Sequence, residues 1–396
     1  TALLGPALAV VLGVVPAREA FAPFGDPLIF LFLGSFLFAR AMSVHGLDRR
    51  LAGAVLALPA ASASPRRLVV TFAGLAAALS MWLSNSATTA MLYPIALGVL
   101  ASFSSAGARR PGLERALLLA CAYGASIGGI GTPVGSPPNL VAIGQLEALA
   151  GIRVGFVSWS LVGIPVMLAM LAVVVLVVGS RAGDGRWERP PSTGRDRGPM
   201  GAGERGVTAA FSATVACWVA PGLLSLVLGA EHPLAAALGR ALPEGVVAVL
   251  GASLLFVLPA GGGRFALTWD EAARIDWGTL LLFGGGLSLG GAMFRTGLSE
   301  ALGHGIVGAT GVSTLAGLTI VFSVFSIFFT EVTSNTAAAT MLVPLAIASA
   351  QAAGVSPLEP TLGCALGCSM AFMLPVATPP NAIVYGSGLV PITQMV

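Results

Sequence analysis

An apolar stretch at residues 118–148 is interrupted by the sequence Pro133-Val134-Gly135-Ser136-Pro137-Pro138-Asn139. The interruption recurs 242 positions later, within residues 361–390, as Pro375-Val376-Ala377-Thr378-Pro379-Pro380-Asn381. Because proline has no amide hydrogen, a helix that meets two prolines leaves the carbonyls four residues back without donors. The sequence therefore predicts two broken helices, 118–148 and 361–390. The carbonyls freed by the breaks are those of Pro133, Val134, Pro375 and Val376.

Two more motifs recur in the same order along the chain. Leu31-Phe32-Leu33-Gly34 returns 251 positions later as Leu282-Phe283-Gly284-Gly285, and Ser84-Asn85-Ser86 returns 250 positions later as Ser334-Asn335-Thr336. Matches in a constant order indicate a duplicated unit, with repeat 1 at 26–148 and repeat 2 at 278–390. We interpret 68–83 and 87–102 as the arms of a re-entrant helical hairpin at 68–102, and 315–350 as its counterpart.

The composition requires a lipid environment. The 396 residues are 56% hydrophobic and 9% charged, with a mean hydropathy of +0.91. Apolar runs close to the roughly 20 residues that cross a bilayer occur at about 26–44, 118–148, 154–179, 207–229, 242–260 and 278–298. We therefore predict an all-α polytopic membrane protein with no soluble domain. Residues 1–25 read as a partial N-terminal membrane segment, and we expect further helices of the complete protein beyond both ends.

The segments between the repeats predict how they are oriented. A transmembrane helix at 149–180 and scaffold helices at 207–260 make three crossings, and an odd number inserts the second repeat upside down. All 20 basic residues are arginines, and this topology puts 16 on one side of the membrane and four on the other. Since cytoplasmic loops are enriched in arginine, we expect the side with 16 arginines to face the cytoplasm. The membrane would be the cell inner (plasma) membrane. The cytoplasmic side includes 181–206, a Gly-, Pro- and Arg-rich linker.

Each polar break offers ligand groups at membrane depth. At Ser84-Asn85-Ser86 one helix ends in free carbonyls and another begins with free amides, so cation ligands lie beside an anion-facing helix start. Ser136 and Thr378 place a hydroxyl beside each proline break, and Gly135 and Ala377 allow close approach to the backbone. No arginine lies in these four motifs, so an anion bound there would depend on a co-bound cation. Glu331, the acid closest to a hairpin tip, reads equally as an ion or proton site and as a structural acid.

These motifs resemble those of the divalent-anion:sodium symporter family over residues 26–390. The resemblance implies a homodimer with a scaffold and a transport domain that moves as an elevator, and Na⁺ as the coupling ion at two or more sites. It maps sodium site 1 onto Ser80, Ser84, Asn85 and Gly135, and sodium site 2 onto Thr330, Thr333, Asn335 and Ala377. The residues implied to hold the substrate are Ser84, Asn85, Ser86, Ser136, Ser334, Asn335, Thr336 and Thr378.

The expected function is sodium-coupled symport of small dianions, C4-dicarboxylates such as succinate, fumarate and malate. A sodium-independent dicarboxylate exchanger, a symporter of sulfate or citrate, and an ion channel stay open as alternatives. One departure from the family is Ser-Asn-Ser at 84–86, where Ser-Asn-Thr is usual. An enzyme is not expected, because His45, His232 and His304 lack partners at motif spacing. Neither an organic cofactor nor a nucleic-acid partner is expected.

Overall fold

The computed structural model describes residues 2–58, 63–104, 110–183, 198–229 and 232–396, and within them the chain is almost entirely helical, as predicted. The N-terminal elements are α1 (Leu4–Val11), α2 (Ala17–Phe21), η1 (Ala22–Gly25), α3 (Pro27–Val44), α4 (Leu47–Leu56), α5 (Pro65–Ser80), α6 (Asn85–Ser104), α7 (Pro111–Gly128) and α8 (Pro137–Ala150). The central elements are α9 (Phe156–Ser180), α10 (Ala202–Leu228), α11 (Pro233–Ala241), α12 (Glu244–Leu254), β1 (Pro259–Gly261), β2 (Arg264–Phe265) and α13 (Trp269–Ala272). The C-terminal elements are α14 (Trp277–Arg295), α15 (Leu298–Thr310), α16 (Leu315–Glu331), α17 (Asn335–Ala352), α18 (Leu358–Cys368), α19 (Pro379–Tyr385) and η2 (Ile392–Gln394).

Several of these helices are long and apolar enough to cross a bilayer. Within the described ranges α3, α9, α10 and α14 each qualify alone. Two bent pairs qualify together, α11 with α12 at 55° and α15 with α16 at 98°. Outward-facing side chains such as Leu176, Val227 and Phe328 are more than half exposed. Apolar exposure of this kind suits contact with lipid rather than with water.

The two predicted hairpins are helix pairs whose bounds are set by caps. α5 begins at Pro65, three residues before the predicted arm, because Ser64 accepts a hydrogen bond from the Arg67 amide and proline suits a first helical turn. α6 begins at Asn85, where Ser84 Oγ accepts from the Ala87 amide at 3.3 Å. Ser334 caps α17 in the same way, accepting from the Ala337 amide at 3.3 Å. Ser84 and Ser334 therefore lie in the two turns and also cap the helices that follow them.

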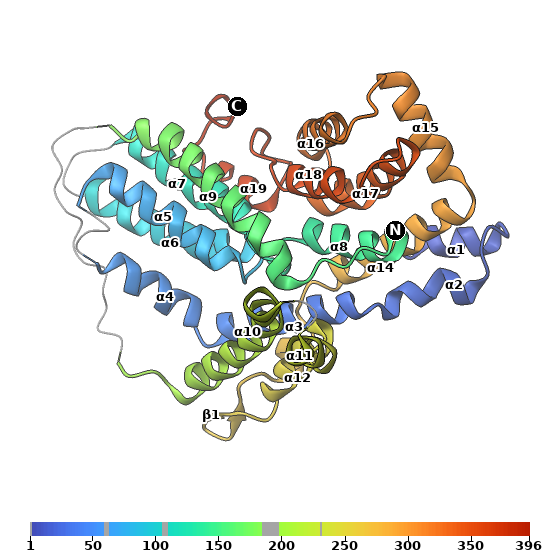
Figure 1. Ribbon diagram of the computed structural model, residues 1–396. Coiled ribbons are helices and arrows are strands. Elements are labelled where there is room, and N and C mark those ends of the chain that lie inside the picture. Colours follow the sequence, from blue (N-terminus) through green and yellow to red (C-terminus); the bar gives the residue numbers. More distant parts are fainter. Residues whose placement is uncertain (1, 59–62, 105–109, 184–197, 230–231) are drawn as a thin grey trace.

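The second half of each broken helix packs on the opposite part of the chain. α8 continues from α7 but contacts α17 and α18, whereas α19 continues from α18 but contacts α6 and α7. Figure 1 shows α5, α6 and α7 on one side of the molecule and α15 to α18 on the other, with α8 and α19 reaching between them. The breaks therefore interlock the two groups of helices at the centre of the fold.

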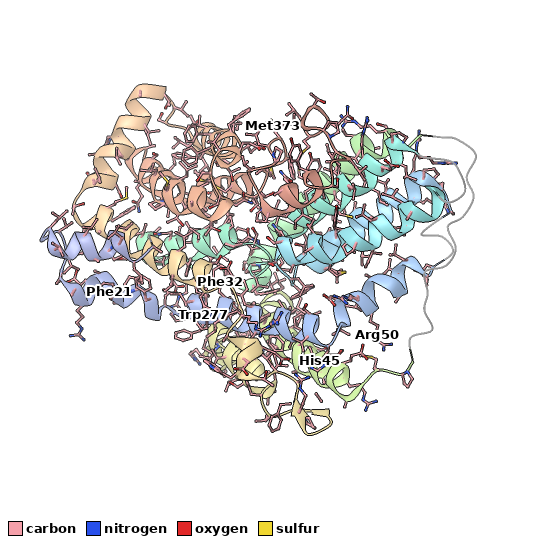
Figure 2. All side chains as sticks on the ribbon, turned by 180° about the vertical axis from the view of Figure 1, so that it is seen from behind. Phe21, Phe32, His45, Arg50, Trp277 and Met373 are labelled. Atoms are coloured by element: carbon pink, nitrogen blue, oxygen red, sulfur yellow. The ribbon has the colours of Figure 1, made fainter. Side chains whose placement is uncertain are left out.

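Helices α3, α10 and α12 form a separate layer. α3 packs along α12, and α10 packs against α12, α3 and β1. His45 Nε2, at the end of α3, lies 2.7 Å from the carbonyl of Ala266, which follows β2, and Arg50 on α4 forms an ion pair with Glu204 on α10 at 2.7 Å (Figure 2). This layer contains the helices within 207–260, which the sequence predicts to be scaffold, together with α3.

The predicted linker at 181–206 is shorter in the structure. α9 ends at Ser180 and α10 already begins at Ala202, because Glu204 accepts a hydrogen bond from the Gly201 amide at 2.8 Å and closes the first helical turn. Residues 184–197 of the predicted linker lie outside the described residues.

Substitution of Gly128 tests the contact between α5 and α7. A Cβ at Gly128 would meet the backbone of Ala77, which cannot move aside as a side chain can. We expect Gly128→Ala to lower stability by about 1–3 kcal/mol through overpacking, measured by thermal unfolding of the purified protein in detergent. Gly74→Ala on α5 is the matched control, because nothing lies within 4 Å of its added Cβ. Equal melting temperatures for the two variants would contradict this packing.

Candidate functional site

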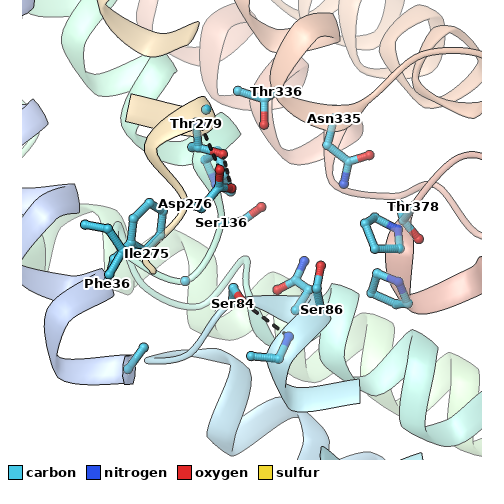
Figure 3. A pocket seen from close by; sticks show the side chains of 18 of the residues that line it. Phe36, Ser84, Ser86, Ser136, Ile275, Asp276, Thr279, Asn335, Thr336 and Thr378 are labelled. Atoms are coloured by element: carbon cyan, nitrogen blue, oxygen red, sulfur yellow. Dashed lines mark hydrogen bonds between the residues drawn. The ribbon is translucent and has the colours of Figure 1, made fainter. Parts of the chain in front are cut away.

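Both hairpin turns and both proline breaks line one cavity. Its volume is about 780 Å³. All eight residues that the sequence predicts to hold a substrate lie in its wall, together with Gly135 and Ala377 (Figure 3): Ser84, Asn85, Ser86, Ser136, Ser334, Asn335, Thr336 and Thr378. These eight residues, up to 294 positions apart in the chain (84 to 378), thus share one space.

The hairpin turns carry the same hydrogen bond. Ser80 Oγ donates to Asn85 Oδ1 at 2.7 Å, and Thr330 Oγ1 lies 2.8 Å from Asn335 Oδ1. Ser80 and Thr330 are fully buried, behind the asparagines rather than in the cavity wall. Thr330 Oγ1 also lies 2.9 Å from the Cys368 carbonyl. These bonds fix the orientation of each asparagine amide at the tip of its turn.

The proline breaks are held by matching asparagines. Asn139 Nδ2 donates to the carbonyls of Gly129 and Thr132, both at 2.7 Å. Asn381 Nδ2 donates in the same pattern to Ala371 at 3.1 Å and Leu374 at 3.0 Å. Each asparagine therefore supplies a donor to the Gly129 or Ala371 carbonyl and a second donor to the Thr132 or Leu374 carbonyl, which also accepts from a backbone amide of its own turn. These are not the carbonyls of Pro133, Val134, Pro375 and Val376 that the sequence predicts, because the two prolines begin the next helix instead of interrupting one. The hydroxyls of Ser136 and Ser369 lie 3.3 Å apart and connect the two breaks directly.

Oxygen atoms lie close around two glycines, Gly129 and Gly135, beside the first turn. A Cβ added to Gly129 would lie 2.5 Å from Asn85 Oδ1 and 3.0 Å from the Gly135 carbonyl oxygen. A Cβ added to Gly135 would lie 2.7 Å from the Gly129 oxygen and 2.9 Å from the Ser80 oxygen. The donors are neutral oxygens, and the described residues contain no group of three His, Cys, Asp or Glu side chains. Such a donor set fits a hard monovalent cation better than a transition metal.

The second predicted ion site differs in detail. Asn335 lies in the cavity wall, and Ala377, 4% exposed, lines it with its own methyl group. Thr333 lies in the turn and is half-buried, but it does not line the cavity. Of the four residues predicted for this site, Asn335 and Ala377 therefore lie in the cavity wall, and Thr330 and Thr333 do not.

Glu331 holds the second break from behind. Its Oε1 accepts hydrogen bonds from the Phe372 and Met373 amides at 2.7 and 2.9 Å, and its Oε2 accepts from the Leu374 amide at 2.9 Å. The corresponding position in the first hairpin is Met81, whose carbonyl accepts from the Thr132 hydroxyl. Of the two interpretations of Glu331 from the sequence, this geometry supports the structural one.

The sequence motifs missed one wall of the cavity. It comes from α3 and from the start of α14 and includes Phe36, Arg40, Arg274, Asp276 and Thr279. None of these residues lies in a repeated motif. The signal that was available is their spacing: on α3, the lining residues Phe36, Ala39, Arg40 and Ser43 follow a helical stripe.

Replacement of the Glu331 carboxylate tests its role in holding the break. In Glu331→Gln one oxygen becomes an NH₂ donor, which cannot accept from the backbone amides of 372–374. We expect a loss of about 1–3 kcal/mol in stability, seen as a lower melting temperature of the purified protein. Glu300→Gln on the exposed face of α15 is the control. An unchanged melting temperature in Glu331→Gln would show that the three hydrogen bonds do not support the fold.

Known proteins resemble this chain along its length. The citrate-transporter family profile matches residues 1–362. An uncharacterized transporter of Haemophilus influenzae is 36% identical over an alignment of 405 residues that covers 100% of this chain and 82% of the relative. Sodium-dependent dicarboxylate transporters SdcS of Staphylococcus saprophyticus and Staphylococcus aureus (strain USA300) are 32% and 33% identical, covering 100% and 96% of this chain and 77% and 74% of the relatives.

A solved structure shares the fold. The crystal structure of the Alcanivorax borkumensis YdaH transporter matches with a TM-score of 0.62 at 16% identity, covering 98% of this chain and 83% of that chain. At this identity the likeness concerns the fold alone. The resemblance seen in the motifs is thus confirmed by full-length sequence matches. The chain belongs to the citrate-transporter family and is a multi-pass membrane transporter of the divalent-anion:sodium symporter type, not an enzyme.

Proposed function

We propose that the protein is a secondary active transporter that couples the uptake of small dianions, C4-dicarboxylates such as succinate, fumarate and malate, to sodium. The observation that carries this proposal is the single cavity of about 780 Å³ in which two hairpin turns and two proline breaks meet. A C4-dicarboxylate has two charged ends, and the cavity offers two similar sets of hydroxyl and amide donors. The relatives named sodium-dependent dicarboxylate transporters support the same substrate class.

Sodium is the coupling ion that suits the neutral oxygens. In this proposal the first ion is held by Ser80, Ser84, Asn85 and Gly135, where oxygen atoms lie too close to Gly129 and Gly135 for a methyl group to be added at either. The second ion is held by Thr330, Thr333, Asn335 and Ala377. The turns and breaks that line the cavity carry no ionised side chain. Bound sodium would therefore supply the positive charge that the substrate carboxylates need beside the turns, so that substrate affinity depends on sodium.

The repeated elements support an alternating-access mechanism. The order α3 to α8 corresponds to the order α14 to α19. In each series the second helix follows a glycine in the left-handed conformation: Gly46 (φ 67°) before α4 and Gly297 (φ 74°) before α15. We propose that the two units are inverted in the membrane, so that their hairpins open to opposite sides. The hairpins and broken helices would move as a transport domain against a scaffold that includes α10 to α12, in an elevator-type motion.

The proposed assembly is a homodimer in the inner membrane. Only 11% of the apolar window of α10 and 22% of that of α9 are buried within one chain, which leaves apolar surface for lipid or for a second subunit. We propose that the linker 181–206 faces the cytoplasm, because the arginine bias supports that orientation.

Reconstitution tests the coupling. We expect labelled succinate to enter liposomes that contain the protein when a sodium gradient points inward, and not when potassium replaces sodium. Unlabelled citrate and sulfate, added as competitors, rank the alternative substrates. Uptake that needs only unlabelled succinate inside the liposomes, with no sodium requirement, would contradict symport and establish exchange.

The asparagines at the two turns test the ion sites. We expect Asn85→Ala and Asn335→Ala each to raise the sodium concentration for half-maximal uptake by about tenfold, because each loses an oxygen ligand worth about 1.4 kcal/mol. Wild-type uptake should rise with more than the first power of sodium concentration, since two sites are filled. Thr310→Ala, at the exposed end of α15, is the control. Unchanged sodium dependence in both asparagine variants would remove these sites from the mechanism.

A further inference from the structure

Two arginines lie in the cavity wall without partners. Arg40 on α3 and Arg274 just before α14 both line the cavity. The Nε atom of Arg40 is buried without a hydrogen-bond acceptor. Across the described ranges, neither guanidinium forms a hydrogen bond or an ion pair, although Arg50, Arg153 and Arg264 do. Arg40 is half-buried, so its guanidinium is less well solvated than that of a surface arginine and an anionic ligand there gains a strong interaction, whereas Arg274 is exposed and adds its charge.

The positions of Arg40 and Arg274 in the fold explain why both line the cavity. Arg40 continues the α3 stripe begun by Phe36, one helical turn earlier, and Arg274 directly precedes Ile275 at the start of α14. Figure 3 shows Phe36 and Ile275 beside each other in one wall, apart from Asn335 and Thr378 in the opposite wall. Phe36 and Ile275, the neighbours of the two arginines along the chain, therefore line a different wall from Asn335 and Thr378.

The acid nearest to them in sequence is already engaged. Asp276 lines the same wall, but its Oδ1 accepts from the Thr279 amide at 3.1 Å and its Oδ2 accepts from the Thr279 hydroxyl at 2.6 Å. It caps α14 with both oxygens. Asp276 is also the only acid among the described residues that line the cavity, so the two arginines leave this wall with a net positive charge.

We propose that Arg40 and Arg274 form a second anion subsite, which holds a carboxylate of the substrate on the side of the cavity away from the second hairpin turn. This inference rests on the proposed transport of dianions. It adds two charged side chains to a cavity in which the other proposed substrate-binding groups are neutral hydroxyls and amides. Because both arginines sit on the side that the arginine bias assigns to the cytoplasm, the subsite serves the open state in which the substrate exchanges with the cytoplasm.

Sided transport measurements test the subsite. We expect the double variant Arg40→Gln, Arg274→Gln to raise the half-saturating succinate concentration at the cytoplasmic face by about fivefold to tenfold, measured in inside-out vesicles. The half-saturating concentration at the outer face, measured in right-side-out vesicles, should change less than twofold. High ionic strength should shrink the difference between wild type and variant, because the lost interaction is between charges.

Two further variants separate charge at the subsite from charge in general. Arg40→Lys keeps a positive charge and should stay within about threefold of the wild type. Arg153→Gln removes an arginine that does not line the cavity and that forms an ion pair with Glu147 at 2.7 Å. It should leave the half-saturating succinate concentration unchanged at both faces. An equal effect of the double variant on both faces, or none at the cytoplasmic face, overturns the subsite.

These outcomes are independent of the coupling ion. If uptake proves independent of sodium but the sided effect holds, the symport proposal fails and the subsite stands. If sodium coupling holds without a sided effect, the reverse is true. Where succinate is not transported at all, calorimetry with succinate and the solubilised protein decides: weaker binding by the double variant supports the subsite, and equal binding overturns it.

Discussion

Two side-chain amides make this fold possible. A backbone break at membrane depth leaves carbonyls without donors, and each such group costs free energy unless it finds a partner inside the protein. Asn139 and Asn381 donate to the Gly129 and Thr132 carbonyls and to the Ala371 and Leu374 carbonyls, respectively. Because these bonds meet the demand of the backbone locally, the proline breaks can face a cavity without destabilising the surrounding helices.

The rest of the arrangement follows from these breaks. Once α7 and α18 stop, the chain can redirect α8 and α19 into the opposite group of helices. Glycines in this region, such as Gly128, allow the helices to approach closely enough for the turns to reach the breaks. The contact between the Ser136 and Ser369 hydroxyls lies where the two redirected segments meet. The hydrogen bonds at the breaks, the close helix packing and the shared cavity thus depend on one another.

Much of the cavity could be predicted from the sequence, because it is built from motifs that occur twice. Duplication makes a short polar motif recognisable, and it led to both turns, both breaks and the eight polar lining residues that they carry. Single features gave no such signal. Arg40 and Phe36 line the cavity only because α3 turns that stripe inward, and the partners of Glu331 are backbone amides, which no sequence pattern identifies. The observed starts of some helices differ from the predicted ones by a few residues, because capping residues such as Ser64 fix where a helix begins.

The two breaks match in sequence but are not equally firm. The second is anchored by a carboxylate that accepts three amide hydrogens, while the first has a single hydroxyl bond from Thr132 in the corresponding place. At the first break the amides of Ile130 and Gly131 bond instead to the carbonyls of Ile127 and Gly128 in their own segment. The duplicated architecture thus ties its second break to the adjacent hairpin through more hydrogen bonds than its first, so the second break and its hairpin would move together.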